Sequence, residues 1–266
     1  MTSSTTAFIG SIPELYDRYL GPVLFEPYAI EVARRLPPNA TRVLEVAAGT
    51  GRVSRHLLAA MSPAATLVAT DLNDAMLVRA AQLVSDPRVT WRTADAQALP
   101  LGDGEVDVVV CQFGLMFVPD KPLALREMRR VLRAGGRLLL ATWDRVERND
   151  ATTVLQELAV AAFPDDPPQF MLTPFSMPDP DVLRTLVADA GFSTVEVETV
   201  QRTGRSESAA SLATGFVRGN PLWNQLVERG VDGPAFEAAV TAALVARFGD
   251  RPCDSPLSAH VVTAIA

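Results

Sequence analysis

Residue types that build metal sites and disulfide scaffolds are scarce in this 266-residue sequence. It contains two cysteines, Cys111 and Cys253, and two histidines. Zinc sites and disulfide-rich folds need clusters of these residues, so the sequence predicts neither a bound metal ion nor a disulfide scaffold. Basic residues are also outnumbered, with a formal charge of −7. Because nucleic-acid-binding surfaces are basic, nucleic acid is not the expected partner.

Long apolar runs are absent as well. The longest mostly apolar run, from Val108 to Val118, is interrupted by Gln112. It is much shorter than the about 20 residues that cross a bilayer. No basic residue precedes Arg18, and the first residues contain no apolar signal segment. We therefore expect a cytoplasmic protein that does not insert into a membrane.

Short apolar segments alternate with helical patterns in the first half of the sequence. Strands are expected at residues 42–46, 66–70, 88–93, 106–110 and 137–143. Helices are expected between them, one capped by Asp74 and another by Asp120. Such alternation at short spacing is typical of a doubly wound α/β fold with a mostly parallel sheet.

The second half is less regular and predicts a mainly helical cap. Strands at 192–200 and 260–265 would complete a seven-stranded, Rossmann-like sheet whose last strand is antiparallel. We divide the chain into an N-terminal aromatic lid of helices (1–40), a cofactor-binding core (41–145), a cap segment plus strand six (146–205), a helical cap insertion (206–256) and a closing strand (257–266).

The loop at residues 47–51 follows a buried strand and leads into a helix, a place where backbone approaches a ligand closely. A dinucleotide fingerprint fails here, because Ser54 replaces its third glycine and Glu45 would repel a pyrophosphate. A plain strand-to-helix turn is the simpler alternative. Asp71 ends the next strand, where a carboxylate can accept hydrogen bonds from both ribose hydroxyls; a helix-capping or solvated aspartate is the alternative.

Five ordered segments together resemble a known family. They are residues 45–51 (EVAAGTG), Asp71, residues 95–100 (DAQALP), residues 113–120 (FGLMFVPD) and residues 129–138 (RRVLRAGGRL). Residues 41–143 thereby resemble the class I S-adenosylmethionine-dependent methyltransferases, in the branch that includes the ubiquinone- and menaquinone-biosynthesis enzymes. The resemblance implies S-adenosylmethionine as the cofactor.

The resemblance also implies roles for individual residues. Glu45 would lie near the methionine amino group, Asp71 on the ribose, and Asp95 with Ala96 at the adenine. The other implied cofactor contacts are Ala47, Gly49 and Gly51 in the loop, Leu72 and Met76 over the adenine ring, and Gln112, Phe113 and Phe117 after the fourth strand. Ala47 departs from the family, which more often has glycine there. Alanine fits this position if its φ is negative.

The N-terminal aromatic residues would form a lid in this family. Tyr16 and Tyr19, rather than Tyr28, are the expected contacts to the sulfonium, which a ring face attracts through cation–π interaction. An amphipathic packing helix is the alternative. A general base is not required for methyl transfer, but His260 and Tyr16 are the catalytic candidates, ahead of His56.

These inferences converge on methyl transfer to a small, hydrophobic or aromatic metabolite at carbon, oxygen or nitrogen. The apolar side chains of the cap suit such an acceptor. The transfer would be an in-line displacement that depends chiefly on proximity. Two alternatives stay open at this point: a nicotinamide-dependent oxidoreductase, and a cofactor-binding protein without turnover.

Overall fold

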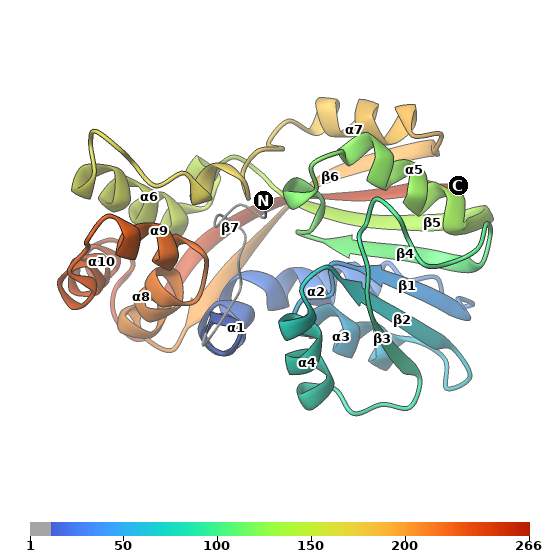
Figure 1. The fold of residues 1–266 in the computed structure, drawn as a ribbon, viewed down its shortest axis with the longest axis horizontal. Coiled ribbons are helices and arrows are strands. Elements are labelled where there is room, and N and C mark those ends of the chain that lie inside the picture. Colours follow the sequence, from blue (N-terminus) through green and yellow to red (C-terminus); the bar gives the residue numbers. More distant parts are fainter. Residues whose placement is uncertain (1–11) are drawn as a thin grey trace. The chain divides into compact units, whose positions relative to one another are not determined.

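One sheet organises the residues that the computed structural model describes, residues 12–266 (Figure 1). Its strand order is β3-β2-β1-β4-β5-β7-β6. The strands are β1 Arg42–Val46, β2 Thr66–Asp71, β3 Val89–Thr93, β4 Val106–Gln112, β5 Leu132–Trp143, β6 Ser193–Ser206 and β7 Cys253–Ile265. Strands β1 to β5 pair in parallel, and β7 is antiparallel to β5 and β6. The expected seven-stranded, mostly parallel sheet with an antiparallel last strand is confirmed.

Helices connect these strands. They are α1 Ile12–Leu15, a π-helix at Tyr16–Phe25, α2 Glu26–Arg34, α3 Arg52–Ala60, α4 Asp74–Leu83, α5 Lys121–Val131, α6 Asp150–Ala162, α7 Pro180–Asp189, α8 Ala209–Arg218, α9 Leu222–Glu228 and α10 Gly233–Phe248. Short 3₁₀ turns lie at Leu115–Phe117, Val146–Arg148 and Phe170–Leu172. Asp120 caps α5 as expected, since its carboxylate accepts from the Leu123 amide at 2.8 Å. The expected cap at Asp74 is wrong, because the side chain of Asn73 accepts from the Ala75 amide instead.

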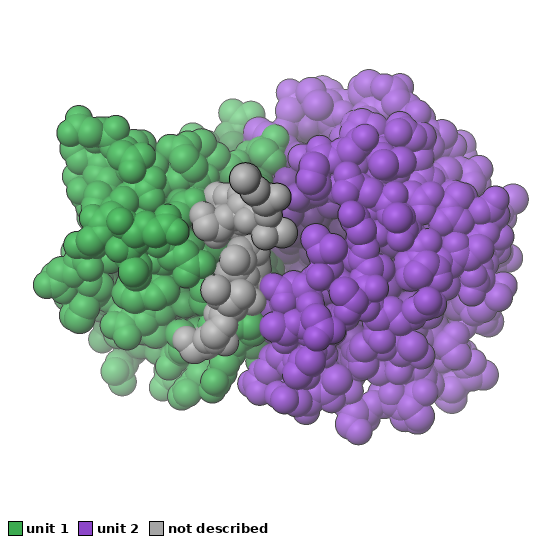
Figure 2. All heavy atoms as spheres, in the orientation of Figure 1, with its two compact units in different colours: residues 1–27, 145–176, 201–258 green, residues 28–144, 177–200, 259–266 purple. Residues whose placement is uncertain are grey.

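The residues group into two compact units (Figure 2). Unit 1 comprises residues 1–27, 145–176 and 201–258, of which 1–11 lie outside the described residues. Unit 2 comprises residues 28–144, 177–200 and 259–266. Strands β6 and β7 contribute residues to both units.

In unit 2, the sheet has helices on both faces. Helices α5 and α7 cover one face, and α2, α3 and α4 lie on the other (Figure 1). Every residue of β4 is buried, as expected of a valine-rich central parallel strand. The core on the α5 and α7 face includes Leu44, Val109, Leu140, Met128 and Val187. Packing of these side chains holds the strands in place, and with them the strand ends at which the candidate site lies.

Strands β5, β6 and β7 extend beyond their predicted ranges by at least five residues each. Strand β5 begins at Leu132 rather than at residue 137, because it continues through Gly135 and Gly136. There the Gly135 amide donates to the Ala266 carbonyl at 2.9 Å, so pairing with the end of the chain compensates for two glycines. Strands β6 and β7 extend beyond the predicted ranges, to Ser206 and from Cys253. Polar and apolar residues mix in these extensions, which hides the strand pattern.

Unit 1 is mainly helical, as the sequence predicts for the cap. The π-helix packs against α8 through a glycine contact: a Cβ at Gly215 would lie 2.8 Å from side-chain atoms of both Tyr19 and Leu20. Helix α10 packs against α6 and α8. Glycine at position 215 therefore gives the room that this close approach requires.

Candidate functional site

The loop after β1 is built by left-handed backbone and short hydrogen bonds. The Ala48 amide donates to the Thr70 carbonyl at 2.9 Å, and the Gly51 amide donates to the Ala48 carbonyl at 3.0 Å. The φ angles are +56° at Gly49 and +79° at Gly51. A Cβ at Gly49 would meet no atom within 4 Å, so the backbone faces open space there. A Cβ at Gly51 would lie 3.0 Å from the Trp91 ring, which excludes a side chain on steric grounds also.

Alanine at position 47 would be unstrained only with a negative φ, and the structure does not meet that condition. Its φ is +58°, in the left-handed region that costs an alanine about 1–2 kcal/mol. The loop therefore contains strain at its first position. The surrounding structure must compensate for this cost.

Asp71, at the end of β2, holds this loop. Its Oδ2 accepts from the Gly49 amide at 2.8 Å, and its Oδ1 accepts from the Asn73 amide at 2.8 Å. Burial raises the pKa of the Asp71 carboxyl, and the backbone hydrogen bonds from Asn73 and Gly49 oppose that rise. A carboxylate has about four acceptor positions, so both oxygens retain capacity for further donors such as hydroxyl groups.

Glu45 is the most deeply buried acid of the candidate set, at 1% exposure. Its Oε2 accepts from the Ser54 hydroxyl, on α3, at 2.5 Å. Burial, with a smaller contribution from the charge of Asp71, raises the pKa of Glu45 to about 8, while the Ser54 hydrogen bond opposes the rise. A nearby cation would favour the ionised form of this side chain.

Two apolar residues predicted at the adenine differ in exposure. Leu72 directly follows Asp71 and is 69% exposed, whereas Met76 on α4 is 4% exposed. Asp95 and Ala96 are half-buried in the loop after β3. The Asp95 Oδ1 accepts from the Gln97 amide at 2.8 Å, and both its carboxylate oxygens contact the Gln97 Nε2 at 3.1 Å. These bonds fix the orientation of the Asp95 carboxylate.

An aromatic cluster forms at the ends of β4 and β5, and the sequence analysis missed it. The Phe113 ring stacks on the Trp143 ring with centroids 3.8 Å apart, and Tyr28 meets both rings edge-on. The Tyr28 hydroxyl donates to the Val200 carbonyl at 3.0 Å. All three rings are buried. Aromatic residues directly at two strand ends, Phe113 and Trp143, were the available signal.

The candidate cofactor contacts at the end of β4 are buried or half-buried. Gln112 is 9% exposed and Phe117 is half-buried in a 3₁₀ turn. Phe113, between them, has a φ of +56°, and its amide donates to the Ala141 carbonyl at 2.9 Å. Strained backbone of this kind is concentrated at functional sites.

His260, on β7, is 2% exposed and has partners at both ring nitrogens. Its Nδ1 lies 3.0 Å from the Thr199 hydroxyl. Its Nε2 lies 3.0 Å from the Pro178 carbonyl, to which it donates, and 3.5 Å from Asp144. His56 is half-buried on α3. His260 is a candidate base from the sequence, should the reaction need one, and these contacts give its side chain a structural role as well.

Tyr16 and Tyr19 lie in the π-helix of unit 1. The Tyr16 ring stacks on Phe25 with centroids 4.8 Å apart, and the guanidinium of Arg18 lies 5.2 Å from the centre of the Tyr19 ring. A π-helix is rare and is frequently found at functional sites. Of the predicted lid at residues 1–40, residues 1–11, which include Phe8, lie outside the described residues.

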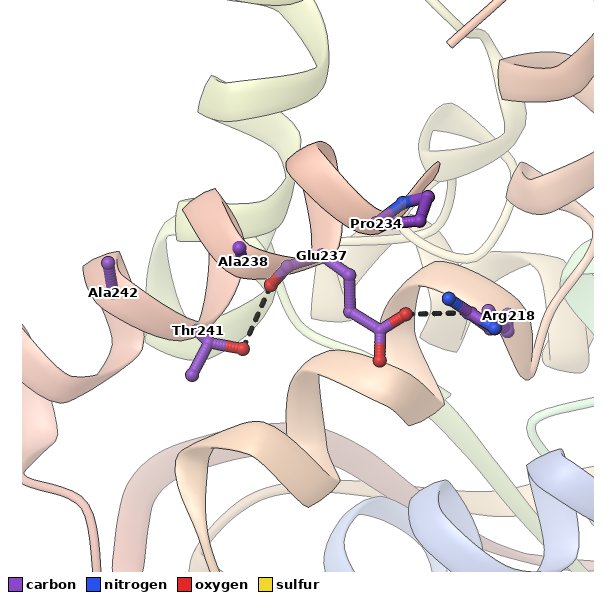
Figure 3. A pocket seen from close by; sticks show the side chains of 6 residues that line it. All are labelled: Arg218, Pro234, Glu237, Ala238, Thr241 and Ala242. Atoms are coloured by element: carbon purple, nitrogen blue, oxygen red, sulfur yellow. Dashed lines mark hydrogen bonds and ion pairs between the residues drawn. The ribbon is translucent and has the colours of Figure 1, made fainter. Parts of the chain in front are cut away.

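Unit 1 also contains a shallow hollow of about 540 Å³ between α8 and α10 (Figure 3). Its lining is Arg218, Pro234, Glu237, Ala238, Thr241 and Ala242. The Arg218 Nε donates to the Glu237 carboxylate at 2.5 Å, so the charges of this hollow neutralise each other. Apolar residues of the cap such as Phe170, Met171 and Phe216 do not line this hollow and are buried within unit 1.

The described residues contain neither a candidate metal site nor a membrane-spanning helix. Within 12–266, no three His, Cys, Asp or Glu side chains form a group that could hold a metal ion. Across the same residues, no helix combines the length and the apolar character that a bilayer crossing requires.

The strand ends of unit 2 fit the adenosyl cofactor that the resemblance implies. Open space lies over the Gly49 backbone, and Asp71, which holds that backbone, has acceptor capacity for a diol. An exposed leucine, Leu72, follows directly and offers an apolar surface to a ring. The buried carboxyl of Glu45 is a further acceptor. Together these residues suit a ligand with hydroxyls, an aromatic base and a cationic amine.

Comparisons with known proteins agree with this fit. A family model described as "Methyltransferase domain" matches residues 44–140. The ubiquinone/menaquinone biosynthesis C-methyltransferase of Shewanella oneidensis is 30% identical over 205 residues, which are 71% of this chain and 78% of that protein.

Two solved structures share the fold at lower identity. Phosphoethanolamine N-methyltransferase 2 of Haemonchus contortus, in complex with S-adenosyl-L-methionine, has a TM-score of 0.59 at 14% identity and covers 95% of this chain and 56% of that one. The [4+2]-cyclase SpnF has a TM-score of 0.59 at 18% identity, covering 96% and 92%. The relative at 30% identity decides the family: the chain belongs to the class I S-adenosylmethionine-dependent methyltransferases, and S-adenosylmethionine is its cofactor.

Proposed function

We propose that this methyltransferase acts on a small, hydrophobic or aromatic metabolite. The carrying observation is the aromatic cluster of Tyr28, Phe113 and Trp143, which follows the same sheet edge as the acids Glu45 and Asp71. Ligand pockets are lined mainly by apolar and aromatic side chains with few polar groups. The C-methyltransferase name of the relative at 30% identity favours a carbon acceptor over oxygen or nitrogen.

We assign the cofactor to the strand ends of unit 2. Asp71 would accept from the ribose hydroxyls, and Glu45 would pair with the amino group of the methionine part. Asp95 and Ala96 would contact the adenine, with Leu72 and Met76 as its apolar neighbours. The remaining proposed contacts are Ala47, Gly49, Gly51, Gln112, Phe113 and Phe117, together with Tyr16 and Tyr19 from the N-terminal segment.

When bound, S-adenosylmethionine supplies a methyl group on a positively charged sulfur. The residues of this chain then contribute mainly by position, because aligning an acceptor within about 3–3.5 Å of the reacting atom supplies several kcal/mol without an acid or a base. Rigid rings such as Phe113 and Trp143, stacked at 3.8 Å, suit that task. His260 and Tyr16 remain the proposed proton acceptors where the acceptor group must lose a proton.

Radiolabel transfer tests this function. The purified chain is incubated with S-adenosylmethionine labelled in its methyl group and with panels of quinols, phenols and amines. We expect label to enter quinols or phenols, and calorimetry to show binding of S-adenosylhomocysteine. Absence of transfer to every panel, or transfer to amines alone, would contradict the proposed substrate class.

The catalytic candidates need a separate measurement. In a Tyr16→Phe variant the ring remains but the hydroxyl is lost, so a fall in transfer rate with unchanged S-adenosylhomocysteine binding would support Tyr16 as proton acceptor. His260→Gln provides the same comparison for the histidine. If both variants transfer methyl groups at the parent rate across pH 6 to 9, neither residue is the base.

A further inference from the structure

Two loops at the end of the central strands touch through one methyl group. A Cβ built on Gly114, after β4, would lie 2.3 Å from the Cβ of Ala47, after β1. The same Cβ would lie 3.8 Å from the Ala47 Cα and 3.1 Å from the Cys111 Sγ. Carbon atoms that are not bonded to each other cannot lie 2.3 Å apart. The methyl of Ala47 therefore occupies the space that a side chain at position 114 would need.

Gly114 is required for space rather than for its backbone conformation. Its φ of −103° and ψ of −38° are open to any residue. Ala47 is the opposite case, since its φ of +58° favours glycine, yet it has a side chain. The left-handed backbone at position 47 would favour glycine but has alanine, and the ordinary backbone at position 114 would accept alanine but has glycine. A glycine at position 47 would remove the strain but would also remove the methyl that contacts Gly114, so strain and contact come together in this residue.

The contact joins two different parts of the proposed site. On one side, Ala47 precedes the backbone that Asp71 holds through the Gly49 amide at 2.8 Å. On the other side, Gly114 follows Phe113, whose ring stacks on Trp143 and whose φ is also left-handed, at +56°. The methyl of Ala47 therefore sets the separation between the loop proposed to hold the cofactor and the ring proposed to face the acceptor.

We propose that Ala47 is a positioning residue for methyl transfer, whose side chain acts as a spacer against Gly114. This proposal rests on the proposed function, because it assigns the two loops to cofactor and acceptor. One methyl group between the loops is the requirement, whichever loop contributes it. Without that methyl the loops are free to approach each other, and the reacting groups lose alignment even though each loop remains folded.

Moving the methyl from one loop to the other tests the spacer. In Ala47→Gly the left-handed strain is relieved, so the melting temperature stays equal or rises. The rate of label transfer at saturating S-adenosylmethionine falls about tenfold, since small displacements are costly to aligned reactions. Binding of S-adenosylhomocysteine stays within about threefold, because Asp71 still holds the Gly49 amide.

Gly114→Ala should melt at a lower temperature, because its new methyl overlaps that of Ala47. The double variant Ala47→Gly/Gly114→Ala should recover both melting temperature and transfer rate to within about threefold of the parent. In it, the new Cβ lies 2.3 Å from where the old one was, and its nearest remaining neighbour is the Cys111 Sγ at 3.1 Å.

Two control variants separate the spacer from generic effects. Gly102→Ala adds a methyl to another glycine without left-handed φ, where the nearest atom is a Glu105 oxygen at 3.4 Å. Thr194→Gly relieves left-handed strain, at φ +46°, away from the site. Both should transfer methyl groups at the parent rate.

Specific results would overturn the proposal. They are a parental transfer rate in Ala47→Gly, or a double variant no better than Gly114→Ala. A parent chain that transfers no label to any panel overturns the proposed function and the positioning role together. In that event, recovery of melting temperature in the double variant would still show the packing contact, so the two failures are distinguishable.

Discussion

The two units bury different kinds of polar side chain. Among the described residues, every buried Asp, Glu and His lies in unit 2; these residues are Glu45, Asp107, Asp144 and His260. The buried polar residues of unit 1 are neutral: Asn149, Thr152, Ser206, Ser208, Asn220, Gln225, Ser255 and Ser258. Unit 1 contains ion pairs that are partly exposed, such as Arg218 with Glu237, whose side chains are 41% and 19% exposed.

The buried acids of unit 2 indicate where a ligand could bind. Burying a carboxyl costs free energy unless hydrogen bonds or an opposite charge compensate, so a buried acid is expected where it binds a ligand or anchors the backbone. Asp107 is such a backbone anchor, since its Oδ2 accepts from the Thr41 and Arg42 amides at 2.7 and 2.9 Å. Glu45 has a single side-chain donor, Ser54, and is the stronger candidate for a ligand. We therefore expect substitutions in unit 2 to have larger effects than matched substitutions in unit 1.

Glycine substitutions should give the largest contrast. Gly51→Ala, in unit 2, combines a φ of +79° with a Cβ 3.0 Å from the Trp91 ring. We expect it to lower the free energy of unfolding by about 2–4 kcal/mol. Gly230→Ala, in unit 1, has a φ of +73° but no atom within 4 Å, so strain alone should cost about 1 kcal/mol. Urea unfolding measures both; equal losses would remove the contrast.

The pH dependence of stability should identify Glu45. Its pKa is near 4.5 in the unfolded chain and about 8 in the folded one, so the folded state retains a proton that the unfolded state has lost. Stability without cofactor should therefore fall as pH rises from 4.5 to 8, by up to about 1.4 kcal/mol per pH unit. Glu45→Gln should reduce this slope and leave the contribution of Asp71, whose pKa is also raised by burial.

Glu127 provides the matched control for that measurement. Its pKa is lowered by hydrogen bonds from Arg130, the opposite direction to Glu45. Its contribution is thus present above the ordinary pKa of 4.5 and is lost in acid. Glu127→Gln should leave the slope between pH 5.5 and 8 unchanged, and a Glu45→Gln variant that keeps the slope would contradict the assignment.

Cofactor affinity should depend on Asp71. Asp71→Ala removes the acceptor of the Gly49 amide together with the proposed ribose contact. We expect S-adenosylhomocysteine to bind about 1–3 kcal/mol more weakly, roughly fivefold to 150-fold. Asp74→Ala, three residues along and exposed, is the control. Calorimetry that finds equal affinity in both variants would exclude Asp71 as a cofactor ligand.

The smallest effect is expected in unit 1. Glu237→Gln removes an ion pair with Arg218, whose side chain is 41% exposed. The Glu237 side chain is 19% exposed. Such partly exposed pairs contribute about 1 kcal/mol, so the free energy of unfolding should change by about that amount, without any change in cofactor affinity. A loss comparable to that of Gly51→Ala would mean that charge matters as much in unit 1 as in unit 2.

The sequence could predict most of unit 2 because its elements are locally specified. Mostly apolar segments of five residues predicted β1, β2 and β4, and Asp120 marked the start of α5. The acids Glu45 and Asp71 were identifiable because each directly ends or lies in a strand before a loop. These are short-range signals, and the folded chain preserves them.

Other features depended on contacts between distant residues and could not be predicted locally. The left-handed φ of Ala47 is compatible with the sequence only once Gly114 gives its methyl room. The stacking of Phe113 on Trp143 joins residues 30 positions apart. The partners of His260, on β6 and before α7, likewise come from long-range pairing. Spacing in one sequence does not contain this information.

The position of β7 has a consequence for the order in which the sheet is assembled during synthesis. Strand β7 is the last of the seven to leave the ribosome, yet it lies between β5 and β6. Until it emerges, β6 has no neighbour to pair with, and β5 exposes an open edge of the kind that invites aggregation. Nascent chains arrested before residue 253 should therefore depend on chaperones more strongly than released ones.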